Sequence, residues 1–142
     1  MIVSVDSHAS EPLYLQIRNQ VVAGIATGQL EPGSPLPSVR ALASDLGINL
    51  HTVNKAYAVL RDEGYVLMRG RAGAVVADPA GKESQSASQA AQVQMDEELF
   101  KLALAFRARG GTQGEFAEHA VQAAQRAYGP SCAGEASSGK EA

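Results

Sequence analysis

A short run of polar side chains in the middle of the sequence is suited to reading DNA bases. The run comprises Asn49, His51, Thr52, Asn54 and Lys55. Hydroxyl, amide and imidazole groups near the start of a helix can form hydrogen bonds with base edges in the major groove. The free N–H groups of the same helix end, here around Asn49, can hold phosphate. The run therefore predicts a base-reading helix.

The helix that must carry these side chains is predicted over residues 51–63 by its apolar pattern. The apolar residues are Val53, Ala56, Tyr57 and Leu60. Their spacing of three and four residues places them on one side and leaves the polar run on the other faces. Asn49 can cap the start of this helix, and Gly64 ends it. Tyr57 and Tyr65 are interpreted as core or interface rings, because they go with the apolar side.

The elements on either side complete a small domain. Amphipathic helices are predicted over residues 12–27 and 39–46, the second with Ser38 as its cap and Gly47 at its end. Two short strands, 65–69 and 74–77, are joined by Gly-Arg-Ala-Gly, which suits a tight hairpin. This order predicts a mainly α fold with a small β-hairpin, in which residues 1–78 form an N-terminal winged helix-turn-helix.

The composition changes after Asp78. Residues 79–92 are small and polar, and they form either a linker or the start of a helix. Residues 93–129 are predicted to form two amphipathic helices, the second with a capping box of Thr112 and Glu115, and residues 130–142 a disordered tail.

The two C-terminal helices cannot bury their apolar faces against each other alone, so they are predicted to be a helical dimerisation tail. The expected dimer-interface residues are Leu99, Leu102, Phe106, Phe116, Val121 and Tyr128. The alternative for this apolar stripe is ordinary packing within one chain.

One long string of residues is much more specific than the order of elements. Residues 30–66 read LEPGSPLPSVRALASDLGINLHTVNKAYAVLRDEGYV. This string resembles the DNA-binding domain of the GntR family, whose pattern is L-x-P-G-x-x-L-P-S-x-R-x-L-A-x-x-L-G and then T-V-x-x-A-Y-x-x-L-x-x-E-G-Y. The resemblance covers roughly residues 11–77, and the short tail resembles the YtrA-type subfamily. The resemblance implies that Arg40 corresponds to the arginine that contacts DNA at the groove edge.

The sequence departs from the family pattern in two places. Many members have an arginine where this chain has Leu50, and the wing, often R-Q-G-K-G-T-F-V, is RGRAGAVV from Arg69 to Val76. Arg69 and Arg71 can still lie along the minor groove or the backbone. The predicted DNA-binding set is Arg40, Asn49, His51, Thr52, Asn54, Lys55, Arg69 and Arg71. Lys55 either contacts phosphate or only solvates its helix, and Thr52 either reads a base or only stabilises the first turn.

The charge of the chain requires the cationic surface to be local. The net charge is -3, and residues 1–78 hold six basic and seven acidic side chains. Nucleic-acid binders are commonly basic overall. The alternative is therefore a winged-helix protein-interaction module without specific DNA binding.

Nothing in the sequence indicates an enzyme, a cofactor or a metal site. His8, His51 and His119 are far apart and Cys132 is the only cysteine, so the spacing of a metal site is missing. No phosphate-binding glycine loop or catalytic triad pattern is present. No apolar run approaches the ~18 residues of a membrane span and no signal peptide is recognised, so we expect a cytoplasmic protein without a membrane partner.

With the resemblance, the sequence predicts a sequence-specific regulator of transcription. Its expected partner is a pseudo-palindromic operator in double-stranded DNA, which it binds as a homodimer with two recognition helices about one DNA turn apart. The resemblance implies a repressor of its own operon or a neighbouring transporter operon. A small-molecule effector is left open, because a ligand could bind between the tail helices without a recognisable motif.

Overall fold

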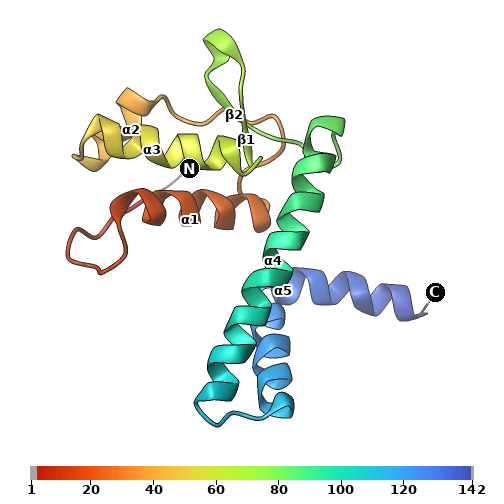
Figure 1. Cartoon of the computed structure of the whole chain (residues 1–142). Helices are drawn as coiled ribbons and strands as arrows, with labels where there is room; N and C mark the ends of the chain where they lie inside the picture. The colour runs from red at the N-terminus through yellow and green to blue at the C-terminus, as the bar shows by residue number, and fades with distance from the viewer. Residues whose placement is uncertain (1–2, 142) are drawn as a thin grey trace. The chain divides into compact units, whose positions relative to one another are not determined.

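The structure is a computed structural model that describes residues 3–141, excluding the side chains of residue 72 and of residues 82–87 and 130–141. The chain divides into two compact units, residues 1–91 and residues 92–142 (Figure 1). The predicted boundaries at 78 and 92 remain predictions, although the division between the units lies close to the second of them.

The first unit begins with three helices, α1 (Leu13–Ala26), α2 (Val39–Leu46) and α3 (Leu50–Asp62). Each lies within one residue of its expected bounds. Gly47 has a φ of 66°, a left-handed conformation that glycine adopts without strain, and it ends α2 so that the chain can turn into α3. The helix-turn-helix expected from the sequence is thus present.

The hairpin follows α3 and consists of β1 (Val66–Met68) and β2 (Ala74–Val76), which pair antiparallel with Leu67 opposite Val75. A short 3₁₀ turn, Gly70–Ala72, joins the strands. The other edge of β2 pairs with the segment before α2: Leu36 N–H donates to the Ala74 carbonyl at 2.8 Å, and Val76 N–H donates to the Ser34 carbonyl at 2.9 Å. The sequence predicted only a loop here, because its Gly and Pro content hides the pairing.

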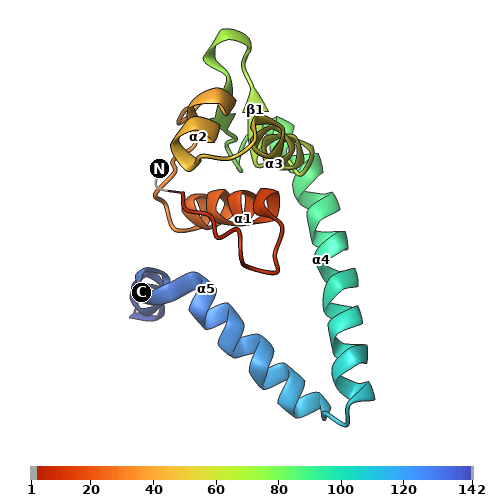
Figure 2. The same cartoon turned by 90° about the vertical axis from the view of Figure 1, so that its left-hand side faces the viewer.

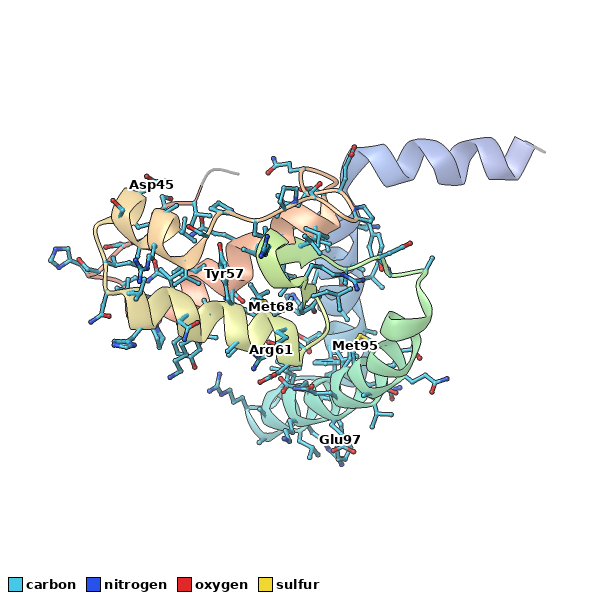
Figure 3. The ribbon with its side chains drawn as sticks, turned by 90° about the horizontal axis from the view of Figure 1, so that it is seen from above. Asp45, Tyr57, Arg61, Met68, Met95 and Glu97 are labelled. Atoms are coloured by element: carbon cyan, nitrogen blue, oxygen red, sulfur yellow. The ribbon has the colours of Figure 1, made fainter. Side chains whose placement is uncertain are left out.

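The core of this unit is formed by the apolar faces that the sequence predicted. Its largest fully buried side chains are Ile17, Leu60, Val21, Val53, Val66 and Val76. They come from α1, α3 and both strands, so the three-helix layer and the hairpin share one core. Tyr57 is also buried (Figure 3). Its hydroxyl donates to the Pro37 carbonyl at 2.7 Å, which connects α3 to the segment before α2.

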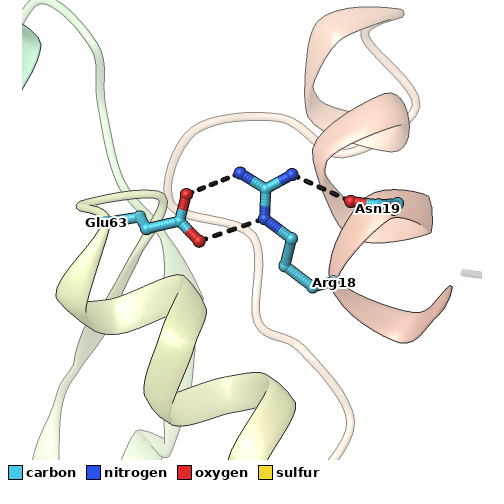
Figure 4. Close-up of polar contacts among 3 residues, drawn as sticks. All are labelled: Arg18, Asn19 and Glu63. Carbon is cyan, nitrogen blue, oxygen red and sulfur yellow. Dashed lines mark hydrogen bonds and ion pairs between the residues drawn. The ribbon is translucent and has the colours of Figure 1, made fainter. Parts of the chain in front are cut away.

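An ion pair fixes the far end of α3 to α1. Arg18 on α1 donates from Nε and Nη2 to the two carboxylate oxygens of Glu63, at 3.1 and 2.5 Å (Figure 4). The Arg18 guanidinium also lies 5.4 Å from the centre of the Tyr65 ring. These hydrogen bonds to Glu63 hold the pKa of Arg18 above its ordinary value. Bidentate geometry of this kind restricts orientation as well as distance.

The C-terminal part contains two helices, α4 (Lys82–Ala108) and α5 (Gln113–Glu141). Of the two readings of residues 79–92, the helix start is the one observed from Lys82 onward. At the start of α5, the Thr112 hydroxyl donates to Glu115 Oε1 at 2.8 Å, and Glu115 N–H donates to the Thr112 hydroxyl at 3.2 Å. The predicted capping box is therefore confirmed.

Within α5 the helix is interrupted at Gly129, where φ is 63° and ψ is -177°. The sequence ended its helix at this residue and expected a disordered tail at 130–142, whereas the backbone resumes a helical path as far as Glu141. The side chains beyond Gly129 and the whole of Ala142 lie outside the described residues. The fold class expected from the sequence, mainly α with a small β-hairpin, is confirmed.

Candidate nucleic-acid interface

The start of α3 presents the predicted polar run on its solvent side. Asn49 caps the helix, and its side-chain oxygen accepts a hydrogen bond from His51 N–H at 2.8 Å. His51, Asn54 and Lys55 are exposed, and Thr52 is half-buried. The opposite side of the helix is buried in the core. Packing thus holds α3 in place while its N-terminal turn remains accessible to a ligand.

Arg40 lies on the first turn of the preceding helix and is exposed. Ser38 caps that helix by accepting a hydrogen bond from Ala41 N–H at 3.0 Å, as predicted. Leu42 and Ala43 are buried on the other side of α2. Since α2 and α3 are packed together and joined only by the turn at Gly47, Arg40 belongs to the same helix-turn-helix as the polar run.

Arg69 and Arg71 lie in the connection between the strands, which forms the outer tip of the hairpin (Figure 1). Both side chains are exposed. Arg69 N–H donates to the Gly73 carbonyl at 2.8 Å, and Gly70 and Gly73 have φ values of 53° and 73°. The two glycines allow the tight turn, and the turn holds Arg69 and Arg71 beyond Met68 and Ala74, the last paired residues of the hairpin.

The described cationic side chains of this unit fall into two groups. Arg18 is paired with Glu63, and Arg61 lies 3.3 Å from Asp62, so two of the cations contact carboxylates near the end of α3. Apart from Arg61, the exposed cations described on the helix-turn-helix and the hairpin turn are Arg40, Lys55, Arg69 and Arg71. All four belong to the predicted DNA-binding set. A net charge near zero is therefore compatible with a cationic surface confined to these elements.

One contact of this surface was missed by the sequence reasoning. The Lys55 ammonium lies 4.1 Å from the centre of the Tyr14 ring, in the first turn of α1. A cation over an aromatic face is attracted by the ring quadrupole. The two residues are far apart in sequence, and no local pattern signals that they meet. The contact holds the Lys55 side chain in one region of the surface.

The expected dimer-interface residues behave in two ways. Phe106 of α4 and Phe116 of α5 are half-buried and pack with ring centroids 6.1 Å apart. In contrast, Leu99, Leu102, Val121 and Tyr128 are exposed, Leu102 by 60% and Tyr128 by 69%. The two phenylalanines thus pack within the chain, whereas the other four side chains remain largely accessible to solvent.

The geometry of the C-terminal unit explains this exposure. α4 and α5 meet at the turn around Gly110 and Gly111 and diverge from it (Figure 2). A hollow of about 550 Å³ lies beside this turn, and Phe100, Leu104, Arg107 and Phe116 contribute to its lining. Several large apolar side chains of the two helices are thus exposed within one chain.

Among the described residues, no three metal-ligating side chains come together, and Cys132 lies outside the described side chains. None of the helices there has both the length and the hydropathy that spanning a bilayer requires.

Three helices and a hairpin, with an exposed polar helix start and arginines at the hairpin tip, define a winged helix-turn-helix. Residues 13–76 match the profile described as "Bacterial regulatory proteins, gntR family". A solved structure described as YtrA from Sulfolobus acidocaldarius, a GntR-family transcription factor, is 37% identical. The match covers 74% of this chain and 99% of that one, with a TM-score of 0.59. The chain therefore belongs to the gntR family of bacterial regulatory proteins.

Other relatives agree with this assignment. The chain is 44% identical over 72 residues to the HTH-type transcriptional regulator Rv1152 of Mycobacterium tuberculosis, which covers 51% of this chain and 60% of that protein. It is 41% identical over 71 residues to the HTH-type transcriptional repressor YtrA of Bacillus subtilis, and this match covers 49% of this chain and 55% of that protein. The matched region is thus less than two thirds of either relative. The relatives are named as transcriptional regulators, not enzymes.

Proposed function

We propose that this protein regulates transcription by binding a specific operator in double-stranded DNA, with α3 in the major groove. The observation that carries the proposal is the capped, exposed start of α3, where Asn49, His51 and Asn54 can reach base edges. Arg40 then contacts the backbone or the groove edge beside α3. Arg69 and Arg71 extend the contact along the duplex from the hairpin turn.

The protein acts as a homodimer on a pseudo-palindromic operator. The uncovered Leu99, Leu102, Val121 and Tyr128 support this part of the proposal, because large apolar side chains exposed together favour association. Two copies related by a two-fold axis present two α3 helices to two half-sites. The Bacillus subtilis relative is named as a repressor. We accordingly propose repression, of the protein's own operon or of a neighbouring transporter operon.

The proposal is tested by fluorescence anisotropy on the duplex upstream of the protein's own gene, beside a shuffled duplex, over a series of salt concentrations. Specific sites are commonly about 10³-fold or more tighter than random DNA. We expect a preference of that size, falling steeply with salt. Arg40→Ala should weaken binding by about 1–3 kcal/mol. Arg61→Ala is the matched control, because Arg61 lies at the other end of α3 beside Asp62, and it should leave the affinity unchanged.

The net charge of -3 favours one competing function, a winged-helix module that binds another protein. If the protein has that function, it binds neither duplex, and Arg40→Ala has no effect on DNA binding. Measurable, salt-sensitive preference for one duplex excludes it.

A further inference from the structure

Two large apolar side chains are exposed among the described side chains of residues 3–91: Leu50, by 40%, and Met68, by 53%. Leu50 is the first residue of α3, and Met68 ends β1 in the hairpin. Both elements are the ones that the proposed function places against DNA. The remaining large apolar side chains of this unit are buried or half-buried. Leu50 and Met68 are therefore the two exceptions among the described side chains of this unit.

The position of Leu50 on α3 places it among the groups that are proposed to read bases. It follows the capping residue Asn49 directly, so it belongs to the first turn of the helix. Asn54 lies four residues further on, one turn along the same side of the helix, and is also exposed. An exposed leucine at this point has no hydrogen-bonding group to offer. Any ligand it recognises must present an apolar feature.

The major groove has one apolar feature among its base edges, the C5-methyl group of thymine. We propose that Leu50 is a specificity-determining residue, whose side chain packs against a thymine methyl group in each operator half-site. This assignment rests on the proposed function, because it requires α3 to lie in the major groove. Leu50 distinguishes thymine from the other bases because contact buries the thymine methyl group and the leucine side chain away from water. It cannot recognise guanine, adenine or unmethylated cytosine in this way.

The core of the domain does not require Leu50. The fully buried side chains of α3 are Val53, Ala56 and Leu60, and Tyr57 completes its buried face. Leu50 lies at the edge of this face, one helical turn before Val53, and is 40% exposed. Replacement by alanine removes a partly exposed side chain and keeps a good helix former at the position. We therefore expect Leu50→Ala to have an unchanged circular dichroism spectrum and only a small decrease in melting temperature, so that it is fully folded in the binding assay and binding changes can be assigned to DNA contact.

The test begins with selection of the preferred duplex from a random pool by the full-length protein. Each thymine of the selected duplex is then replaced singly by deoxyuridine, which keeps base pairing and removes only the methyl group. Affinities are measured by anisotropy for the unmodified protein, Leu50→Ala and Met68→Ala. Met68→Ala is the matched control, since it removes the other exposed apolar side chain of the domain.

At one thymine in each half-site, replacement by deoxyuridine should change the affinity. Deoxyuridine there should weaken binding of the unmodified protein about fourfold, the value of one buried methyl group. Met68→Ala should keep this sensitivity, whereas Leu50→Ala should bind both duplexes equally. Selection repeated with Leu50→Arg should enrich guanine at the same position, because arginine pairs with the O6 and N7 atoms of guanine.

Two different outcomes would contradict the proposal, and they can be distinguished. If the protein selects an operator but deoxyuridine has no effect at any thymine, or has the same effect on Leu50→Ala, the role of Leu50 is wrong and the proposed function stands. If no duplex is selected and none is preferred over shuffled DNA, the proposed function is wrong, and the assignment of Leu50 falls with it.

Discussion

At the scale of single residues, Tyr57 connects the stability of the DNA-binding unit to pH. Burial raises the pKa of the Tyr57 hydroxyl to about 12. In the unfolded chain the hydroxyl ionises near its ordinary pKa of 10. Between these values the unfolded state loses a proton that the folded state keeps. The free energy of unfolding is therefore unaffected by this group below pH 10 and falls as pH rises through this window.

The expected loss from Tyr57 is on the order of 2 kcal/mol between pH 10 and 12. It is measured by urea unfolding at successive pH values. In Tyr57→Phe the pH-dependent loss should be smaller by this amount, although the variant starts from a lower stability because its hydrogen bond to the Pro37 carbonyl is missing. An identical alkaline slope in both proteins would contradict the assignment to Tyr57.

Lys55 is one of two residues whose role the sequence left open, and its ammonium lies over the Tyr14 ring. If Lys55 neutralises a phosphate, Lys55→Ala should weaken binding to all duplexes alike and reduce the slope of log K against log salt by about 1. Lys101→Ala, an exposed lysine on α4, serves as the control. An unchanged slope in Lys55→Ala would mean that Lys55 only solvates its helix and contacts no phosphate.

At the scale of elements, the sequence predicted what depends on local chemistry. The caps formed by Ser38, Asn49 and Thr112 lie within three residues of the groups they satisfy, so a short pattern contains all the information. The buried faces of α2 and α3 likewise follow from the spacing of their apolar residues.

Contacts between elements could not be predicted in this way. The pairing of Arg18 with Glu63 joins residues 45 positions apart, and the pairing of residues 34 and 36 with β2 depends on the backbone, which carries no side-chain signal. In the candidate site, the residue types and the helix that carries them were predicted, whereas the Tyr14 contact of Lys55 and the exposure of Leu50 required tertiary structure.

The capping box of α5 gives this element a measurable titration. Hydrogen bonds from the side chain and the backbone of Thr112 lower the pKa of Glu115. The cap therefore stabilises the helix above the ordinary pKa of a glutamate, and this contribution is lost as pH falls through the lowered value. Thr112→Ala should raise the pKa of Glu115, as followed by NMR of its side-chain carboxyl, and Thr112→Ser should keep it low. Equal values in Thr112→Ala and the unmodified protein would show that the cap has no influence on Glu115.

At the scale of the whole molecule, the two units differ in how completely they bury their apolar side chains. The first unit has a continuous core drawn from its helices and strands. In the second, α4 and α5 share the Phe106 and Phe116 contact near their turn, while large apolar side chains along both helices stay exposed. Exposed apolar surface costs free energy in water, and a second surface that covers it removes this cost. This difference is the physical reason to look for a second copy of the chain at α4 and α5.

Association through α4 depends on its exposed leucines. Leu99 and Leu102 are three residues apart on the same side of α4, and both are exposed. Replacing both by aspartate puts charge into the proposed interface without disturbing the core of the first unit. Light scattering should then give the mass of one chain instead of two, and anisotropy should show weaker operator binding, because a monomer engages one half-site at a time. Glu97→Ala changes an exposed residue elsewhere on α4 (Figure 3) and should leave a dimer with unchanged affinity. A dimeric mass for the double aspartate variant would place the interface away from this part of α4.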